Sequence, residues 1–426
     1  MPKIRDILIE SNPWWKDEFT FDYQQRQVFT EIKKYLPMPQ IIALTGLRRV
    51  GKTTLMYKII DKHLKNGFNK NKILYFSFDE FKDAEIRDIL SEFEQIMHQN
   101  ITQASYLVLF DEIQKLKNWD EQLKRIYDTY QKNVKIIISG SESLFIKQKS
   151  KATLAGRLFE FTINPLSFKE YLDFKKIRIT NIDIYKKKLL ILFQEYIKTQ
   201  GFPELVGITD KDIIKKYIKE SIIEKIIYRD LTRLLNINNI PLLESILTII
   251  MEEPGQIIEL SKLSRDLDIS RQTLSNYMRY LEDSFLIHKL YNYSNSKRKV
   301  ERKLKKYYPT ILSPTLLFKT DSLSQSKVFE SILVNQLNAE YFYRDPYKNE
   351  VDIIQLNEPL KPIEIKYGKI ETEGLLKFMD KKNIKQGIVL TNTIEDTKEF
   401  NNKIIQMVPA YKFLLEQDNH TEKSKK

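Results

Sequence analysis

The sequence of 426 residues contains no cysteine. Disulfide bonds, thiolate metal sites and cysteine nucleophiles are therefore excluded. No apolar run approaches the roughly 20 residues that cross a bilayer. The first ten residues, MPKIRDILIE, also lack the apolar core of a signal peptide. From these absences we expect a cytoplasmic protein that does not span a membrane.

Acidic residues are too few to balance the basic ones, with 57 Asp and Glu against 70 Lys and Arg, a net charge of +13. Such an excess favours contact with polyanions, namely nucleic acid or an anionic membrane surface. The alternative is a bias of composition, because the chain is rich in Lys, Ile and Asn. The length predicts two to four domains, at roughly 100–200 residues each.

Apolar segments of strand length alternate with helical patterns in the first part of the chain. They are IIALTG (41–46), KILYFSF (72–78), SYLVLFDE (105–112), VKIIISGS (134–141) and LFEFTI (158–163). This alternation is typical of an α/β domain whose parallel sheet is covered on both faces. We predict such a domain over residues 1–180, followed by a helical segment (181–250), a small helix-and-strand module (251–310), a second α/β domain (325–415) and a disordered polar tail (416–426).

The loop after the first apolar segment reads GLRRVGKTT. Its spacing, between an apolar strand and an amphipathic helix, is that of a P-loop, whose glycines let backbone N–H groups face nucleotide phosphates. Lys52 is expected to reach the β- and γ-phosphates and Thr53 to bind Mg²⁺. The expected ATP-binding residues are Gly46, Leu47, Arg48, Arg49, Val50, Gly51, Lys52, Thr53 and Thr54.

Two acidic residues end the third apolar segment, in YLVLFDEIQ. Asp111 is predicted to hold the Mg²⁺ shell, and Glu112 to polarise the attacking water as general base. The alternative is that both residues only cap the following helix. Ser139 and Ser141 end the next segment, where either is placed to contact the γ-phosphate or the attacking water, or to form a simple turn.

Arg157, in LAGRLFEF, precedes the last apolar segment. It is a candidate for stabilising charge on the transferred phosphoryl group, either within its own chain or from a neighbouring subunit of a homo-oligomer. The alternative is an ordinary ion pair at the surface.

These motifs, together with INPLSFKEYL and the QGFPE segment at 200–204, resemble the AAA-type P-loop ATPases of archaea and bacteria over residues from about 12 to about 370. The resemblance implies a P-loop core, a winged helix and a C-terminal restriction-endonuclease-like α/β domain. It also implies an Asp after an aromatic pair, but the corresponding stretch YYPTILSP (307–314) has none.

Residues 256–293 have the order of a winged helix-turn-helix, with a helix (LSKLSRDLD), a short turn, a second helix and a strand (HKLYNY). Its second helix would bury Leu274, Tyr277, Met278 and Leu281, and such a helix can enter the major groove of DNA. The candidate base contacts are Arg271, Gln272, Thr273, Ser275 and Asn276.

A basic run follows this module, and as a wing it would hold DNA phosphates. Its residues are Lys297, Arg298, Lys299, Arg302, Lys303, Lys305 and Lys306. The alternative is a spacer that contacts protein, with a solvated lysine run.

The segment EVDIIQLNEPLKPIEIKYGK resembles the Asp…Glu-x-Lys arrangement of metal-dependent nucleases. In a strand, Glu364 and Lys366 point to the same face. Asp352 and Glu364 would bind Mg²⁺ or Mn²⁺, with Glu330 completing the shell.

Two basic residues would assist these ligands. Lys366 would orient the attacking water, and Arg344 would contact phosphate or pair with a nearby acid. The alternative is a domain that keeps these residues and only binds.

The sequence thus predicts an ATPase that couples ATP to DNA binding or processing. The alternative from another class is an ATP-dependent signalling or scaffold protein whose C-terminal modules bind protein.

Overall fold

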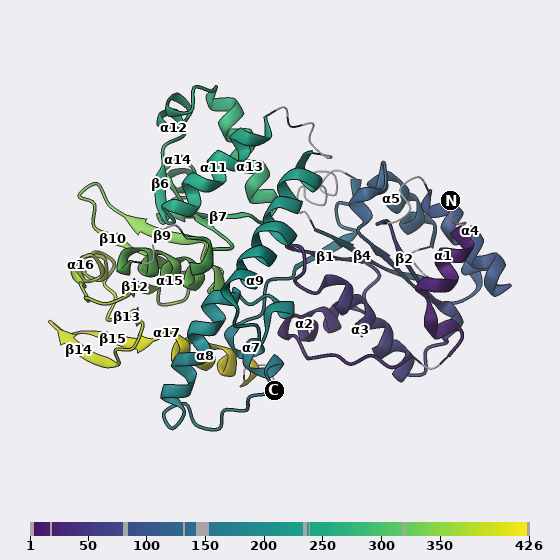
Figure 1. Cartoon of the computed structure of the whole chain (residues 1–426), viewed down its shortest axis with the longest axis horizontal. Coiled ribbons are helices and arrows are strands. Elements are labelled where there is room, and N and C mark those ends of the chain that lie inside the picture. Colours follow the sequence, from purple (N-terminus) through teal and green to yellow (C-terminus); the bar gives the residue numbers. More distant parts are fainter. Residues whose placement is uncertain are drawn as a thin grey trace. The chain divides into compact units, whose positions relative to one another are not determined.

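The computed structural model describes residues 4–17, 19–79, 84–130, 133–141, 153–232, 237, 239–317 and 321–423. The chain forms two compact units, Met1–Pro165 and Leu166–Lys426 (Figure 1). The first unit ends before residue 180, the expected end of the ATPase core. Residues that follow Pro165, such as Phe168 and Tyr171, belong to the hydrophobic core of the second unit.

The first unit is built on a parallel sheet in the order β2-β3-β4-β1-β5. This order places the carboxyl ends of β3, β4 and β1 side by side. The strands are β1 (Ile41–Thr45), β2 (Ile73–Ser77), β3 (Tyr106–Asp111), β4 (Val134–Gly140) and β5 (Leu158–Thr162). All five predicted strands are confirmed.

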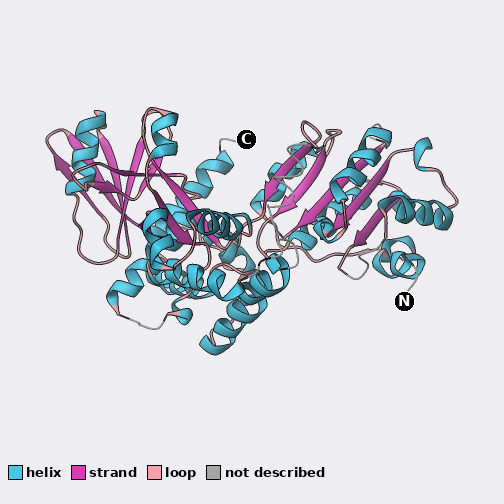
Figure 2. Ribbon diagram, turned by 90° about the horizontal axis from the view of Figure 1, so that it is seen from above, coloured by secondary structure: helices cyan, strands magenta, loops and turns pink. Residues whose placement is uncertain are grey.

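Helices cover both faces of this sheet (Figures 1 and 2). On one face, Ile41 and Ala43 of β1 share a core with three of the helices. These three are α1 (Ile4–Ser11), α4 (Ile86–Met97) and α5 (Trp119–Tyr130), and the helices of the opposite face are α2 (Gln27–Tyr35) and α3 (Lys52–Lys65).

The segment NPWW (12–15) covers the free edge of β2. Asn12 Nδ2 donates to the carbonyl of Tyr75 at 2.9 Å, and Asn12 Oδ1 accepts from the Tyr75 amide at 2.7 Å. Trp15 Nε1 donates to the carbonyl of Ile73 at 2.8 Å. These bonds satisfy backbone groups that an edge strand otherwise exposes.

The second unit begins with helices and continues into a mixed sheet of order β10-β9-β7-β8-β6. The helices are α7 (Phe168–Phe174), α8 (Lys186–Thr199), α9 (Lys211–Lys216), two π-helical segments (Tyr217–Ile223 and Lys225–Leu231), α11 (Ile240–Glu252), α12 (Leu260–Asp266), α13 (Arg271–Asp283) and α14 (Lys297–Arg302). The strands are β6 (Gln256–Ile258), β7 (Ile287–Asn292), β8 (Lys305–Pro309), β9 (Tyr341–Arg344) and β10 (Glu350–Val351).

The C-terminal part adds a second sheet, in the order β11-β12-β13-β15-β14. Its strands are β11 (Ile353–Gln355), β12 (Lys361–Lys366), β13 (Gln386–Thr391), β14 (Asp396–Phe400) and β15 (Lys403–Pro409), with helices α15 (Ser322–Gln336), α16 (Glu373–Lys382) and α17 (Ala410–Lys423). Helix α17 continues past residue 416, where we expected a disordered tail.

One hydrophobic core joins the parts of the second unit that we expected as separate domains. Leu290 and Tyr308, from the sheet after α13, share this core with Phe329 and Ile363 of the C-terminal part. Strand β9 also pairs in parallel with β7. The two parts therefore form one body.

The QGFPE segment is a turn that follows α8. Gly201 has φ of +71°, and an added Cβ would lie 2.6 Å from the carbonyl oxygen of Leu166. Gln200 Oε1 accepts from the Leu312 amide at 3.0 Å. The segment thus has a packing role within the second unit. None of the helices in the described ranges is long and apolar enough to cross a membrane.

Candidate functional site

The phosphate loop connects β1 to α3 at the carboxyl end of β1, which lies between β4 and β5. Gly46 has φ of +138°, and a Cβ there would overlap the carbonyl of Ile163. Gly51 has φ of +97° and starts α3. The Nζ of Lys52 lies 3.0 Å from the carbonyl of Gly46 and 2.7 Å from that of Leu47. The side chain of the buried lysine thus folds over the loop. A bound nucleotide's phosphates would compete with these two carbonyls for the hydrogen bonds of the ammonium.

The other predicted ATP-binding residues differ in exposure. Leu47 and Val50 are buried, Arg48 and Thr53 are half-buried, and Arg49 and Thr54 are exposed. Arg49 also has φ of +62°, in the left-handed region.

Arg26 supports this loop from the start of α2. Its Nη1 donates to the carbonyl of Val50 at 2.9 Å, and its Nη2 donates to the carbonyl of Asn164 at 2.7 Å. The guanidinium therefore ties the phosphate loop to the segment that leaves β5. Arg26 was not predicted, because it belongs to no local sequence motif.

Asp111 is the centre of a hydrogen-bond network at the end of β3. Its Oδ2 accepts from the Thr53 hydroxyl at 2.6 Å and from the Tyr75 hydroxyl at 2.9 Å, and the Ser139 hydroxyl donates to Oδ1. Burial first, and then the charge of Asp111, raise the pKa of Tyr75, so its hydroxyl remains a donor. A hydroxyl and a carboxylate that meet in this way fit Mg²⁺, which prefers oxygen ligands.

Glu112 is held in an unusual backbone conformation beside this network. Its φ is +52°, and its side chain makes no capping hydrogen bond to the short helix after it within the described residues. Gln114 Nε2 donates to Glu112 Oε2 at 2.6 Å and to Ser141 Oγ at 3.1 Å. The helix-cap alternative therefore does not hold for Glu112. Backbone strain of this kind is common at functional sites.

Both predicted serines meet these acids, Ser139 at Asp111 and Ser141 within 3.4 Å of Glu112. Gln114 and Tyr75 were not predicted. The signal for Gln114 was its place in DEIQ, and Tyr75 had none, because its role depends on β2 lying next to β3.

Arg157 lies at the opposite edge of the sheet. It precedes Leu158, which is in register with Ile41 at the start of β1, whereas the phosphate loop follows the end of β1. Its Nε donates to Asp128 Oδ1 at 2.8 Å in a partly exposed ion pair. Arg157 therefore does not reach the phosphate loop of its own chain. The prediction that it stabilises the transferred phosphoryl group within its own chain is wrong.

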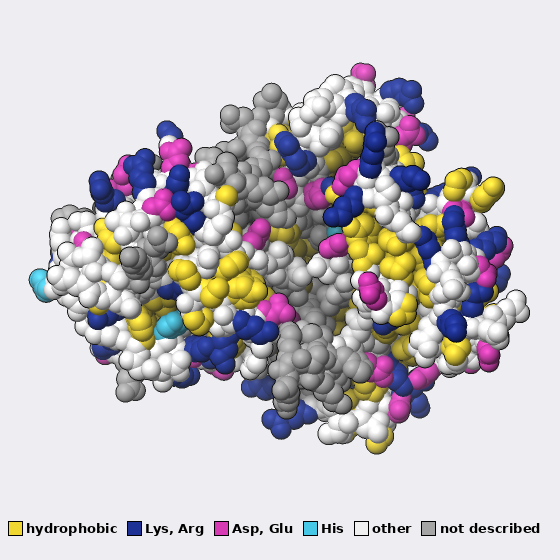
Figure 3. All heavy atoms as spheres, turned by 180° about the vertical axis from the view of Figure 1, so that it is seen from behind, with side chains coloured by type: hydrophobic (Ala, Val, Ile, Leu, Met, Phe, Trp, Pro, Cys, Tyr) yellow, Lys and Arg dark blue, Asp and Glu magenta, His cyan; other side chains and the backbone are white. Residues whose placement is uncertain are grey.

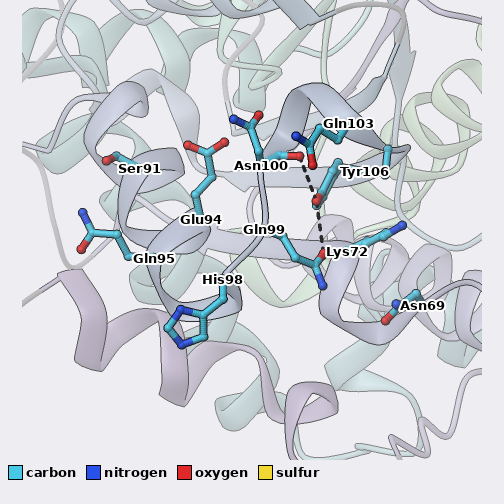
Figure 4. A pocket seen from close by; sticks show the side chains of 11 residues that line it. Asn69, Lys72, Ser91, Glu94, Gln95, His98, Gln99, Asn100, Gln103 and Tyr106 are labelled. Atoms are coloured by element: carbon cyan, nitrogen blue, oxygen red, sulfur yellow. Dashed lines mark hydrogen bonds between the residues drawn. The ribbon is translucent and has the colours of Figure 1, made fainter.

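A shallow hollow of about 730 Å³ lies on the first unit, lined mainly by polar side chains (Figure 4). Tyr106 lines it and donates to Gln99 Oε1 at 3.2 Å. Tyr106 begins β3, whereas Asp111 ends it. The hollow is thus distinct from the phosphate loop.

The candidate nucleic-acid interface combines α13 with the start of α14. Ser270 caps α13, and the predicted buried face of this helix (Leu274, Tyr277, Met278 and Leu281) is confirmed. Of the candidate contacts, Arg271, Gln272, Ser275, Lys297, Arg298 and Lys299 are exposed, whereas Thr273 and Asn276 are half-buried. On the face that Figure 3 shows, Lys and Arg side chains are interspersed with acidic ones.

Lys306 is not part of an exposed wing, which corrects its predicted role. It is 4% exposed, and its Nζ lies 2.5 Å from Glu350 Oε1, 3.6 Å from Asp352 Oδ1 and 3.8 Å from Glu330 Oε1. Burial lowers the pKa of Lys306, but the surrounding side chains outweigh burial and raise this pKa well above its usual value. The ammonium therefore stays charged.

The predicted nuclease residues converge around this lysine. Lys366 Nζ lies 2.7 Å from Glu364 Oε1, and Asp352 Oδ2 accepts from the Ile365 amide at 2.8 Å. Burial, and then the charge of Asp352, raise the pKa of Glu364 to about 8. The same two causes raise the pKa of Glu330.

The expected metal does not fit this arrangement as it stands. Among the residues that the structure describes, no group of three or more acidic or histidine side chains is arranged to hold a metal ion. Lys306 instead contacts three of the carboxylates. Arg344 pairs with Glu350 at 3.3 Å, which is the ion-pair alternative for this residue. Glu350 was not predicted and Lys306 was assigned to the wing, because neither belongs to the Asp…Glu-x-Lys pattern.

Comparison with known proteins agrees with the first unit's geometry. Residues 38–172 match a family described as an AAA domain, and residues 191–310 and 322–413 match two families described as domains of unknown function. The AAA match and the phosphate-loop geometry together support an AAA-type ATPase.

Three relatives extend this comparison. An uncharacterized protein of Methanocaldococcus jannaschii is 28% identical over 407 residues, or 88% of each chain. A second from that organism is 27% identical over 419 residues, covering 89% of this chain and 86% of the relative. An uncharacterized protein of Haemophilus influenzae is 29% identical over 260 residues, covering 59% of this chain and 62% of the relative. The two archaeal relatives thus match both units.

Proposed function

We propose that the protein hydrolyses ATP and uses the nucleotide to control DNA binding by its second unit. The observation that carries the ATPase is the contact of Thr53 with Asp111 at 2.6 Å, beside Lys52 on the phosphate loop. A hydroxyl, a carboxylate and a lysine in this order are what Mg²⁺ and the β- and γ-phosphates require.

The residues around this contact have separate proposed roles in phosphate binding, Mg²⁺ binding and water activation. Lys52 and the loop amides bind the phosphates, and Thr53 with Asp111 would hold Mg²⁺, which supplies charge neutralisation when bound. Glu112 is placed by Gln114 as general base for the attacking water. Ser139 fixes the orientation of Asp111 and of the Glu112 amide, which lies 3.2 Å from its hydroxyl.

Mutation of the two central residues tests the ATPase. We expect Lys52→Ala to abolish ATP binding, and Glu112→Gln to keep binding while lowering kcat by about 100-fold, since removing a general base costs 10²–10⁴-fold. ATP affinity by calorimetry and phosphate release at saturating ATP and Mg²⁺ provide the measurements. Full hydrolysis by Glu112→Gln would refute the role given to Glu112.

DNA binding is proposed for α12, α13 and the hairpin of β7 and β8, acting as a winged helix. Support comes from the exposed polar N-terminus of α13 and from the exposed Lys297, Arg298 and Lys299. The second reading is a scaffold whose winged helix binds protein. We do not assign nuclease activity to the C-terminal part, because Lys306 contacts the carboxylates that a metal needs.

The salt dependence of DNA affinity separates the two readings. Each phosphate contact adds about 0.9 to the slope of log K against log salt concentration. We expect the triple change of Lys297, Arg298 and Lys299 to Ala to lower the slope by about 3. The matched control changes three exposed lysines of α9, namely Lys211, Lys215 and Lys216. If both triple variants bind DNA like the wild type, the proposed DNA contact of Lys297, Arg298 and Lys299 is contradicted, and the scaffold alternative is favoured.

A further inference from the structure

A single lysine from β8 lies among carboxylates of the C-terminal α/β part. Glu330 comes from α15, Glu350 from β10, and Asp352 from the bend between β10 and β11. Lys306 Nζ lies within 3.8 Å of all three. The sequence predicted a phosphate-binding wing for this lysine, but its position among carboxylates indicates a different role.

That role is charge neutralisation. Carboxylates that face one another repel, and a buried charge without a counter-charge is unfavourable. Asp352 and Glu364 are buried, and Glu330 and Glu350 are half-buried. The Lys306 ammonium supplies the missing charge and also donates to the Tyr308 hydroxyl at 3.4 Å, which itself donates to Glu330 Oε1 at 2.7 Å. Two further pairs, Lys366 with Glu364 and Arg344 with Glu350, bring the cluster to three cations for four carboxylates.

We propose that Lys306 takes the place of a divalent metal in this carboxylate cluster and fastens β8 to the C-terminal α/β part. The cluster is then a permanent ion-pair junction within the second unit. It needs no metal to stay folded, and it leaves no room for a catalytic one.

We expect a metal site to form only when the lysine is removed and the carboxylates turn toward the freed space, because no such group is arranged for a metal among the described residues. Glu364 Oε2 is buried and has no hydrogen-bond partner among the described residues. With the ammonium removed, Glu330 and Asp352 would lose their cation, while Glu364 would keep its pair with Lys366. Hard divalent cations such as Mn²⁺ take carboxylate oxygens of this kind.

The first measurement is Mn²⁺ binding to the wild-type chain of 426 residues without nucleotide, monitored through the electron paramagnetic resonance signal of free Mn²⁺. Asp352→Asn is measured beside it. We expect Asp352→Asn to leave Mn²⁺ binding unchanged, because the wild-type cluster already holds its cation. A wild-type Mn²⁺ site that Asp352→Asn removes would overturn the proposal.

The second measurement removes the lysine charge while keeping the side chain's length, in Lys306→Met. We expect this variant to gain one Mn²⁺ site and a Tm that rises by about 5 °C when Mn²⁺ is 100-fold above its Kd. Adding Asp352→Asn should abolish both gains. The control is Lys289→Met, which removes a lysine paired with Glu282 at 2.7 Å, outside the cluster.

A folded Lys306→Met variant that binds no extra Mn²⁺ would also overturn the proposal. If Lys306→Met does not fold, the comparison of wild type with Asp352→Asn still decides, since it needs no change at Lys306. Neither experiment depends on ATP hydrolysis. Failure of the proposed role of Lys306 can therefore be distinguished from failure of the proposed ATPase function.

Discussion

Arg26 shows how one buried side chain positions the phosphate loop. Its guanidinium donates to the carbonyl of Val50, which follows β1, and to the carbonyl of Asn164, which follows β5. Hydrogen bonds from a charged donor contribute about 1.5–3 kcal/mol. Loss of these two bonds would loosen the phosphate loop without removing any side chain that is proposed to contact ATP.

We therefore expect Arg26→Gln to raise the Kd for ATP about tenfold, because 1.4 kcal/mol corresponds to a factor of ten. The kcat at saturating ATP should change much less, since Arg26 supports the loop through the backbone carbonyls of Val50 and Asn164, whereas Glu112 is the proposed general base. Calorimetry and steady-state kinetics measure the two effects. Arg5→Gln is the control, because Arg5 pairs with Glu92 at 3.1 Å on the surface of the same unit. An unchanged Kd would show that the loop holds its shape alone.

Residues whose partners are set by local spacing were predictable. Lys52 and Thr53 follow from the P-loop pattern, and Asp111 from its place at the end of an apolar strand. Arg26 was not predictable, because one of its acceptors lies 138 residues away. Lys306 was misjudged for the same reason, since Glu350 and Asp352 reach it only through tertiary packing.

At the scale of elements, apolar periodicity predicted where strands and helices form. It did not predict the pairing of β7 with β9, because register across distant segments leaves no local trace. The basic run was expected as a wing. It contains the short helix α14, whose Val300 is buried while Lys297, Arg298 and Lys299 stay exposed.

Strand β12 carries a carboxyl group whose titration should be measurable. The pKa of Glu364 is raised from 4.5 to about 8, by burial first and then by the charge of Asp352, against the lowering effects of Lys366 and Lys306. A raised pKa in the folded state means that the group's contribution to stability is complete below pH 4.5. That contribution is lost as pH rises toward 8.

We expect the free energy of unfolding of the wild type to fall relative to that of Glu364→Gln as pH rises from about 5 to about 9. Urea denaturation at each pH, with the unfolding of the second unit followed, gives the difference in free energy of unfolding between the two proteins. Glu399→Gln, at an exposed position of β14, is the control and should show no such trend. A constant difference across this pH range would mean that Glu364 titrates normally.

At the scale of the whole molecule, the shared core of the second unit restricts how nucleotide can act. Leu290, from the sheet after α13, packs in one core with Ile363 of β12. The proposed winged-helix region and the C-terminal part therefore share one core. Any control by ATP must act on the second unit as a body, or act between chains.

Arg157 offers a test of control between chains. It cannot reach its own phosphate loop, yet its guanidinium is partly exposed in a pair with Asp128. If it acts on a neighbouring subunit, Arg157→Ala and Glu112→Gln should each hydrolyse ATP poorly. Mixed in equal amounts, they should regain about a quarter of wild-type activity, because a site with both residues intact forms at that frequency in a homo-oligomer with random assembly.

The control replaces Arg157→Ala by Arg5→Ala, which removes an ion-pairing arginine from the same unit. That variant should hydrolyse ATP normally by itself, so its mixture with Glu112→Gln should show only the activity of the Arg5→Ala subunits. Complementation by Arg157→Ala requires subunits to exchange, which a brief incubation at low protein concentration before mixing would allow. If Arg157→Ala alone keeps full activity, the pair with Asp128 is its whole role, and the arginine that stabilises the transferred phosphoryl group must be sought elsewhere, with Arg48 and Arg49 of the phosphate loop as the nearest candidates.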